Sequence, residues 1–79
     1  MTHSKPIEDC VRASLEQYFK DLKGVEPHAV HDMVLQAVEK PMLEVVMRQA
    51  QGNQSKAAAW LGIHRNTLRR KLLDHKLID

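Results

Sequence analysis

The residues best suited to chemistry lie near the C-terminus, where cationic side chains recur at helical spacing. Arg65 and Arg69 are four residues apart, so a helix would place them on one face. Leu68 and Leu72 have the same spacing and would anchor a different face. An arginine can donate two hydrogen bonds to O6 and N7 of a guanine in the major groove. The pattern predicts a helix that packs on one side and offers hydrogen-bond donors on the others.

A short helix and a tight turn must position this basic helix. Asn53 can cap the preceding helix through its side-chain oxygen, and the alanines at 57–59 are small enough to let a second helix cross closely. Gly62 can adopt the positive φ that ends that helix, while Leu61 and Ile63 beside it point toward the core. A helix, a glycine turn and a basic helix at this spacing predict a helix-turn-helix.

The N-terminal end of the second helix of such a motif meets base edges in the major groove. We therefore expect Arg65 and His64 to contact bases, with Arg65 as the principal base reader. Other donors nearby are better placed for phosphates, which fix the register without carrying sequence information. The expected phosphate contacts are Asn53, Ser55, Thr67, Arg69, Arg70 and Lys71.

Charge is divided unevenly along the 79 residues. Residues 1–47 hold five Lys or Arg against eight Asp or Glu, a net −3, whereas residues 48–79 hold seven against two, a net +5. The C-terminal part is therefore attracted to a polyanion such as double-stranded DNA, and the N-terminal part is not.

Two longer helices are expected before the motif. Apolar residues recur at steps of three and four from Pro6 to Gly24. A second apolar run starts at Pro27, continues through Pro41, where the axis should bend, and ends at Gly52. About 24 residues of helix span roughly 36 Å, more than the ~30 Å of a compact monomer of this size. A second copy packed as a four-helix dimer core would bury the excess apolar surface.

The sequence thus predicts an all-α fold with four helices per chain. Residues 1–5 lack periodicity and are expected to be disordered. Residues 6–52 form the two dimerisation helices, and residues 53–79 form the DNA-binding region, with the motif at about 54–73.

Other side chains receive plainer interpretations. Cys10 is the only cysteine, which excludes an intrachain disulfide and fits the cytoplasm. It is expected to be a buried or half-buried small hydrophobe. Of the five histidines, His28 and His31 have a spacing that could share a metal, but no third ligand accompanies them. We therefore expect all five, including His75, to be solvated surface histidines, and we expect no metal. Trp60 is expected to pack in the core. We expect no membrane segment, cofactor or catalytic residue, because the carboxylates are scattered and no Gly-rich loop is present.

The chain also resembles the bacterial Fis family, factors for inversion stimulation, from Lys5 onward. The matching stretches are Lys5-Pro6, Tyr18-Phe19, Lys40-Pro41, Gly52-Asn53-Gln54 and Gly62-Ile63 through Leu72. The resemblance implies a nucleoid-associated transcription regulator: an intertwined homodimer whose recognition helices lie closer than one DNA turn, so that the DNA bends and sequence preference is weak. It also implies DNA contacts at Asn53, Ser55, Arg65, Thr67, Arg70 and Lys71.

Two departures from the family pattern affect binding. His64 stands where the family usually has Asn, which could make binding depend on pH. Leu73 and Asp74 replace lysines that relatives carry, which lowers the expected nonspecific affinity.

The family also contacts proteins besides DNA. Its turn before the motif touches RNA polymerase, and the corresponding residues here are Arg48, Gln51, Gly52 and Gln54, of which Arg48 and Gln51 depart from the pattern. Recombinase stimulation is not carried over, because few residues precede the first helix.

Two other readings stay open. The chain could be a free-standing relative of the C-terminal domain of nitrogen-regulation activators, which shares this helical arrangement. It could instead be a helical interaction module whose basic helix meets an acidic protein. Salt dependence and sequence preference on DNA would separate the second reading from DNA binding.

Overall fold

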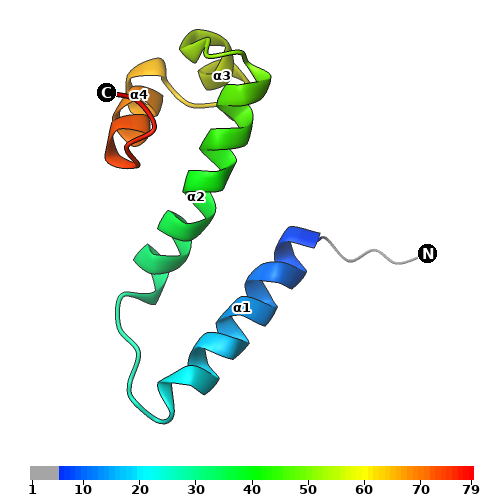
Figure 1. The fold of residues 1–79 in the computed structure, drawn as a ribbon, viewed down its shortest axis with the longest axis vertical. Coiled ribbons are helices and arrows are strands. Elements are labelled where there is room, and N and C mark those ends of the chain that lie inside the picture. The colour runs from blue at the N-terminus through cyan, green and yellow to red at the C-terminus, as the bar shows by residue number, and fades with distance from the viewer. Residues whose placement is uncertain (1–5) are drawn as a thin grey trace, which may run out of the picture. The chain divides into compact units, whose positions relative to one another are not determined.

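The computed structural model describes residues 6–79, and the predicted disorder of residues 1–5 lies outside them. The described chain is all-α, as predicted, with four helices in the order α1 Pro6–Leu22, α2 Val30–Gln49, α3 Gln54–Leu61 and α4 Arg65–Asp74 (Figure 1). No strand occurs within these residues. The chain divides into two compact units, one ending at Val30 and the other running from His31 to Asp79.

Helix α1 carries its acidic residues in its first turn, where the positive end of the helix dipole favours them. The chain leaves the helix through left-handed conformations at Lys23 and Gly24, so the predicted glycine stop is confirmed. None of its residues is buried. Cys10 is therefore exposed within the single chain, and the expectation that it is buried or half-buried was wrong.

Helix α2 begins later than predicted. Residues 25–28 form no helix, and Ala29 adopts a positive φ of 54°, so the helix starts at Val30 and not at Pro27. Its 20 residues span about 30 Å, which no longer exceeds the size of a monomer. The helix continues through Pro41 to Gln49, and the bend expected there stays a prediction.

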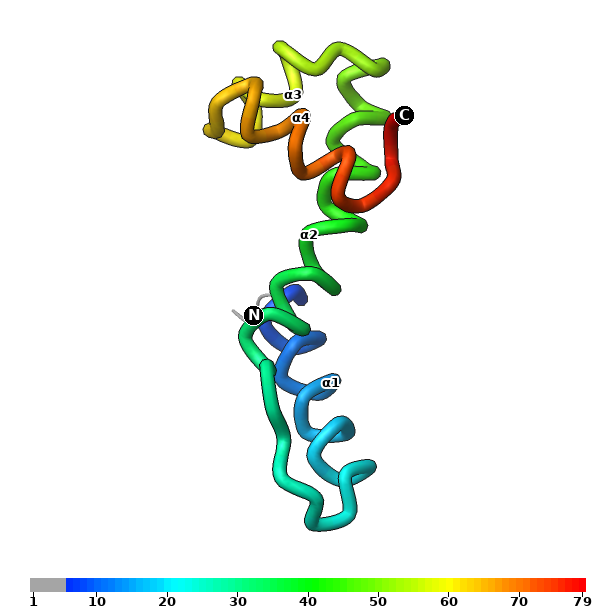
Figure 2. The backbone as a smooth tube through the Cα atoms, turned by 90° about the vertical axis from the view of Figure 1, so that its left-hand side faces the viewer, coloured from blue at the N-terminus to red at the C-terminus, as the bar shows by residue number. Residues whose placement is uncertain are grey.

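The C-terminal unit is built on a small aliphatic core. Figures 1 and 2 both place α3 and α4 beside the C-terminal half of α2. The buried residues are Leu43, Ala50, Ala57, Ala58, Leu68 and Leu72. Leu61 and Ile63 pack against this cluster, as predicted, and so do Leu77 and Ile78 beyond α4. Alanines at the crossing let the helices approach closely, which fixes the motif's geometry.

Both ends of α3 are terminated as the sequence predicts. The Asn53 side chain accepts a hydrogen bond from the Lys56 backbone N–H at 3.0 Å. Gly62 adopts a φ of 75°, and its N–H donates to the Ala58 carbonyl at 2.9 Å. These two caps define the length of α3 and the direction in which the chain enters α4.

Two expectations about side chains were wrong. Trp60 is 57% exposed and does not belong to the core, because the buried face of α3 is that of Ala57 and Ala58. The Lys56 ammonium lies 5.8 Å from the centre of its ring. His75 is not a solvated histidine, since only 7% of its side chain is exposed.

We predict that Leu68→Ala lowers the free energy of unfolding by about 3 kcal/mol, because it leaves a cavity in a core of few residues. Leu73→Ala, at an exposed position of the same helix, should change it by less than about 0.5 kcal/mol. Urea unfolding followed by circular dichroism at one protein concentration measures both. Equal losses from the two variants would contradict the described core.

Candidate nucleic-acid interface

The structure places the side chain of Arg65, the predicted base reader, beside the first turn of α3, the first helix of the motif. Arg65 begins α4 and Ser55 lies in the first turn of α3, ten residues earlier. The Arg65 guanidinium donates to the Ser55 hydroxyl oxygen at 3.4 Å, and both residues are exposed. The N-terminal ends of α3 and α4 therefore form one surface of donors, which helix dipoles make favourable for anions.

His64 has a structural task at this surface that the sequence did not predict. It is the N-cap of α4, and its Nδ1 accepts a hydrogen bond from the Asn66 backbone N–H at 3.1 Å. The neutral ring then carries its proton on Nε2, which remains a donor for an outside acceptor. Protonation of Nδ1 would break the cap and place positive charge at the helix N-terminus. The pH dependence of DNA binding expected from His64 stays a prediction.

Arg69 and Arg70 are exposed on α4, and Thr67 is exposed one turn before Arg70. Within residues 6–79 neither arginine forms an ion pair. An unpaired, hydrated guanidinium can approach a phosphate without first leaving a carboxylate. The structure therefore leaves both arginines available for the role the sequence predicts.

Lys71 differs from the other members of the expected phosphate set. Its ammonium donates to Glu39 Oε2 at 2.7 Å, and the other oxygen of that carboxylate lies 2.9 Å from His75 Nε2. The Glu39 side chain, on α2, is 21% exposed. The hydrogen bond from Lys71, helped by that from His75 and opposed by burial, lowers the pKa of Glu39 below 4.5. No pattern in the sequence indicates this cluster, because Lys71 and His75 lie 32 and 36 residues after Glu39 along the chain.

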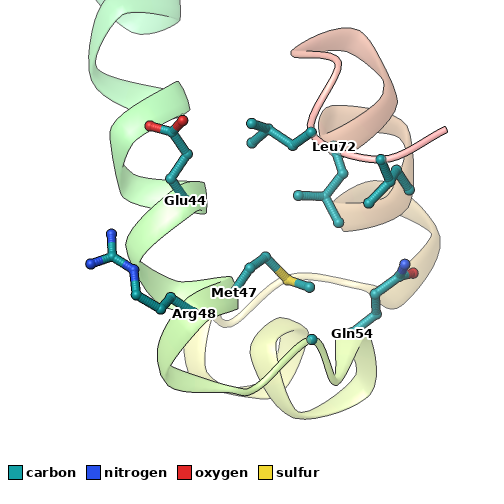
Figure 3. A pocket seen from close by; sticks show the side chains of 8 residues that line it. Glu44, Met47, Arg48, Gln54 and Leu72 are labelled. Atoms are coloured by element: carbon teal, nitrogen blue, oxygen red, sulfur yellow. The ribbon is translucent and has the colours of Figure 1, made fainter.

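Three of the four residues implied in polymerase contact, Arg48, Gly52 and Gln54, line a groove of about 560 Å³. Gln51 is exposed and adopts a positive φ of 54°, but it does not line the groove. Figure 3 shows Met47 and Leu72 reaching toward the same space. The remaining lining residues are Glu44, Leu77 and Ile78. The groove has an apolar floor and a rim of mixed charge.

Among residues 6–79 no group of three or more His, Cys, Asp or Glu side chains is arranged to hold a metal ion. In the same part of the chain, no helix has the length and apolar character needed to cross a bilayer.

Comparisons with known proteins agree with this geometry. The family model described as "Bacterial regulatory protein, Fis family" matches residues 34–75, which include α3 and α4. A Fis-like DNA-binding protein of Neisseria meningitidis serogroup A is 60% identical over 79 residues, covering 99% of this chain and all of the relative. A Fis-like DNA-binding protein of Ralstonia nicotianae is 59% identical over 92% of this chain and 95% of its own length. DNA-binding protein Fis of Mannheimia haemolytica is 46% identical over 87% of this chain and 70% of its own length.

The fold and this surface define a helix-turn-helix DNA-binding protein. The chain belongs to the Fis family of bacterial regulators, as the resemblance in its sequence indicated.

We predict that Glu39→Gln lowers the free energy of unfolding at pH 7 by about 1 kcal/mol, a modest value because the cluster is partly exposed. The pKa of Glu39 is lowered on folding, so its contribution is complete above about pH 4.5 and disappears as the pH falls through the folded-state value. The difference between variant and wild type should therefore disappear in acid.

Urea titrations at several pH values test this. Glu44→Gln, which removes an exposed carboxylate of the same helix, is the matched control and should give no such pH-dependent difference. A constant difference for Glu39→Gln down to strongly acidic pH would contradict the assignment.

Proposed function

We propose that this Fis-family DNA-binding protein is a homodimeric, nucleoid-associated transcription regulator that bends DNA. The observation that carries the proposal is the single exposed surface formed by the N-terminal ends of α3 and α4, with Arg65 reaching Ser55 across it. Such a surface fits a major groove, and binding rather than catalysis is its function.

The roles on this surface divide between bases and phosphates. Arg65 and His64 stand at the start of α4, where a recognition helix meets base edges. Asn53, Ser55, Thr67, Arg69 and Arg70 are exposed on α3, on α4 or at the cap of α3, and their donors suit phosphate oxygens. His64 contributes through Nε2 only, since Nδ1 is used by the cap.

We predict that Arg65→Ala weakens binding to preferred sites by about 1–3 kcal/mol and flattens the preference between sequences. Arg70→Ala should weaken binding to all duplexes alike, because a phosphate contact carries no sequence information. Fluorescence anisotropy on a preferred and a scrambled duplex at the same salt concentration measures both. Indistinguishable effects of the two variants on sequence preference would overturn this division.

The dimer proposal is supported by an apolar stripe on α2. Leu35, Val38, Met42 and Val45 follow one another at steps of three, four and three, and each is more than a third exposed in the single chain. This spacing is that of a helix packing against another helix. The stripe is distinct from the buried position Leu43, which faces the core. A second copy would cover the stripe and supply the second recognition helix.

We predict that Met42→Glu, which places a charge in the stripe, converts the dimer to monomer and lowers the midpoint of thermal unfolding. Lys40→Glu, which places the same carboxylate side chain at an exposed position two residues away, should leave the dimer intact. Sedimentation equilibrium of wild type and both variants measures this. A wild-type protein that is monomeric at micromolar concentration would refute the dimer directly.

Bending follows if the two recognition helices lie closer than one turn of straight DNA, because both can enter the major groove only on curved DNA. The family's intertwined arrangement supports that spacing. We further propose that Arg48, Gln51, Gly52 and Gln54 contact RNA polymerase, which is supported by the position of Arg48, Gly52 and Gln54 in the lining of one groove.

A further inference from the structure

Glu39 links α2 to the last turn of the recognition helix. Its two oxygens are shared between the Lys71 ammonium at 2.7 Å and His75 Nε2 at 2.9 Å. His75 also caps α4, since its backbone N–H donates to the Lys71 carbonyl at 3.0 Å. The three residues thus hold the C-terminal end of α4 against α2 by polar bonds, in addition to the packing of Leu68 and Leu72.

We propose that Glu39 is a positioning residue of the recognition helix and that Lys71 serves as its partner rather than as a ligand of DNA phosphate. The proposal rests on the DNA-binding role proposed for α4. It separates Lys71 from Arg69 and Arg70, which lie on the same helix.

The electrostatics of the cluster support this separation. A charge-assisted bond of 2.7 Å to a carboxylate that is only 21% exposed occupies one of the three ammonium donors and offsets its charge, which weakens its attraction to a phosphate. Breaking it would leave the Glu39 carboxylate, one-fifth exposed, with one partner fewer. The acidic side chain of Asp74 in the same helical turn further opposes a phosphate at this end of α4. The DNA contacts of α4 are therefore confined to its earlier turns.

The position of Glu39 on α2 explains what the link does. It directly follows Val38 and precedes Met42 by three residues, so it adjoins the stripe proposed to face the second copy. A bond from this point to α4 fixes the direction of the recognition helix relative to the dimer interface. That direction sets how the two recognition helices meet successive grooves, and hence which sequences bend to fit.

The salt dependence of binding tests the role of Lys71. Each phosphate contact neutralised by a cation contributes about 0.9 to the slope of log K against log salt. We expect Arg70→Met to reduce the slope by about 1.8 for the two copies of a dimer, and Lys71→Met to change it by less than about 0.5. Equal reductions in the two variants would overturn the proposal.

Glu39→Gln provides the complementary measurement. Releasing Lys71 should steepen the slope by up to about 1.8 for the dimer, and this increase should vanish in the Glu39→Gln, Lys71→Met double variant. The preference for a selected site over a scrambled duplex should fall about fivefold in Glu39→Gln. An unchanged slope and preference in a folded Glu39→Gln dimer would contradict the positioning role.

The outcomes also separate this inference from the proposed function. A wild-type protein without salt-dependent binding to duplex DNA would overturn both. A wild type that binds DNA, and in which Arg70→Met and Lys71→Met reduce the slope alike, would overturn only the role assigned to Glu39 and Lys71. Far-ultraviolet circular dichroism of each variant confirms that it is folded, and Lys71→Met tests the inference even if Glu39→Gln does not fold.

Discussion

The close packing of α3 against α4 is the contact on which the C-terminal unit depends. Ala57 and Ala58 present almost no side chain, and they share one buried cluster with Leu68, Leu72 and Leu43 of α2. A core this small has little room to rearrange without losing contacts. The directions of all the outward side chains on α3 and α4 are consequences of that packing, including the approach of Arg65 to Ser55.

Helix α2 has two tasks because the chain is short. One face supplies Leu43 to the core, and Ala50 joins it directly after the helix ends, whereas the residues of the stripe that includes Val38 and Met42 are more than a third exposed in the single chain. A protein of 79 residues buries a limited share of its apolar surface. In a dimer, folding and association would therefore be coupled, and the DNA-binding surface would be held in place by the same helix that joins the copies. Glu39, on this helix next to the stripe, binds Lys71 and His75 at the end of the recognition helix.

Features encoded by a few neighbouring residues could be predicted from the sequence. The Asn53 cap, the Gly62 turn and the burial of Leu68 and Leu72 each follow from local chemistry or helical spacing. The predictions that were wrong concern features that depend on the backbone conformation or on contacts between distant residues. The start of α2 is later than predicted because Ala29 adopts a positive φ, which is not expected of an alanine. The contact of His75 with Glu39 joins residues 36 apart, and the core face of α3 excludes Trp60, although its size favours burial.

Interference with binding by methylation of guanine N7 tests whether α4 reads the major groove, because that atom lies only in the major groove and is the acceptor assigned to Arg65. On a selected duplex, we expect two symmetry-related guanines whose methylation blocks binding, separated by less than about ten base pairs. The Arg65→Ala variant should no longer distinguish the methylated from the unmethylated guanines. Undisturbed binding to DNA methylated at every guanine N7 would contradict major-groove recognition by α4.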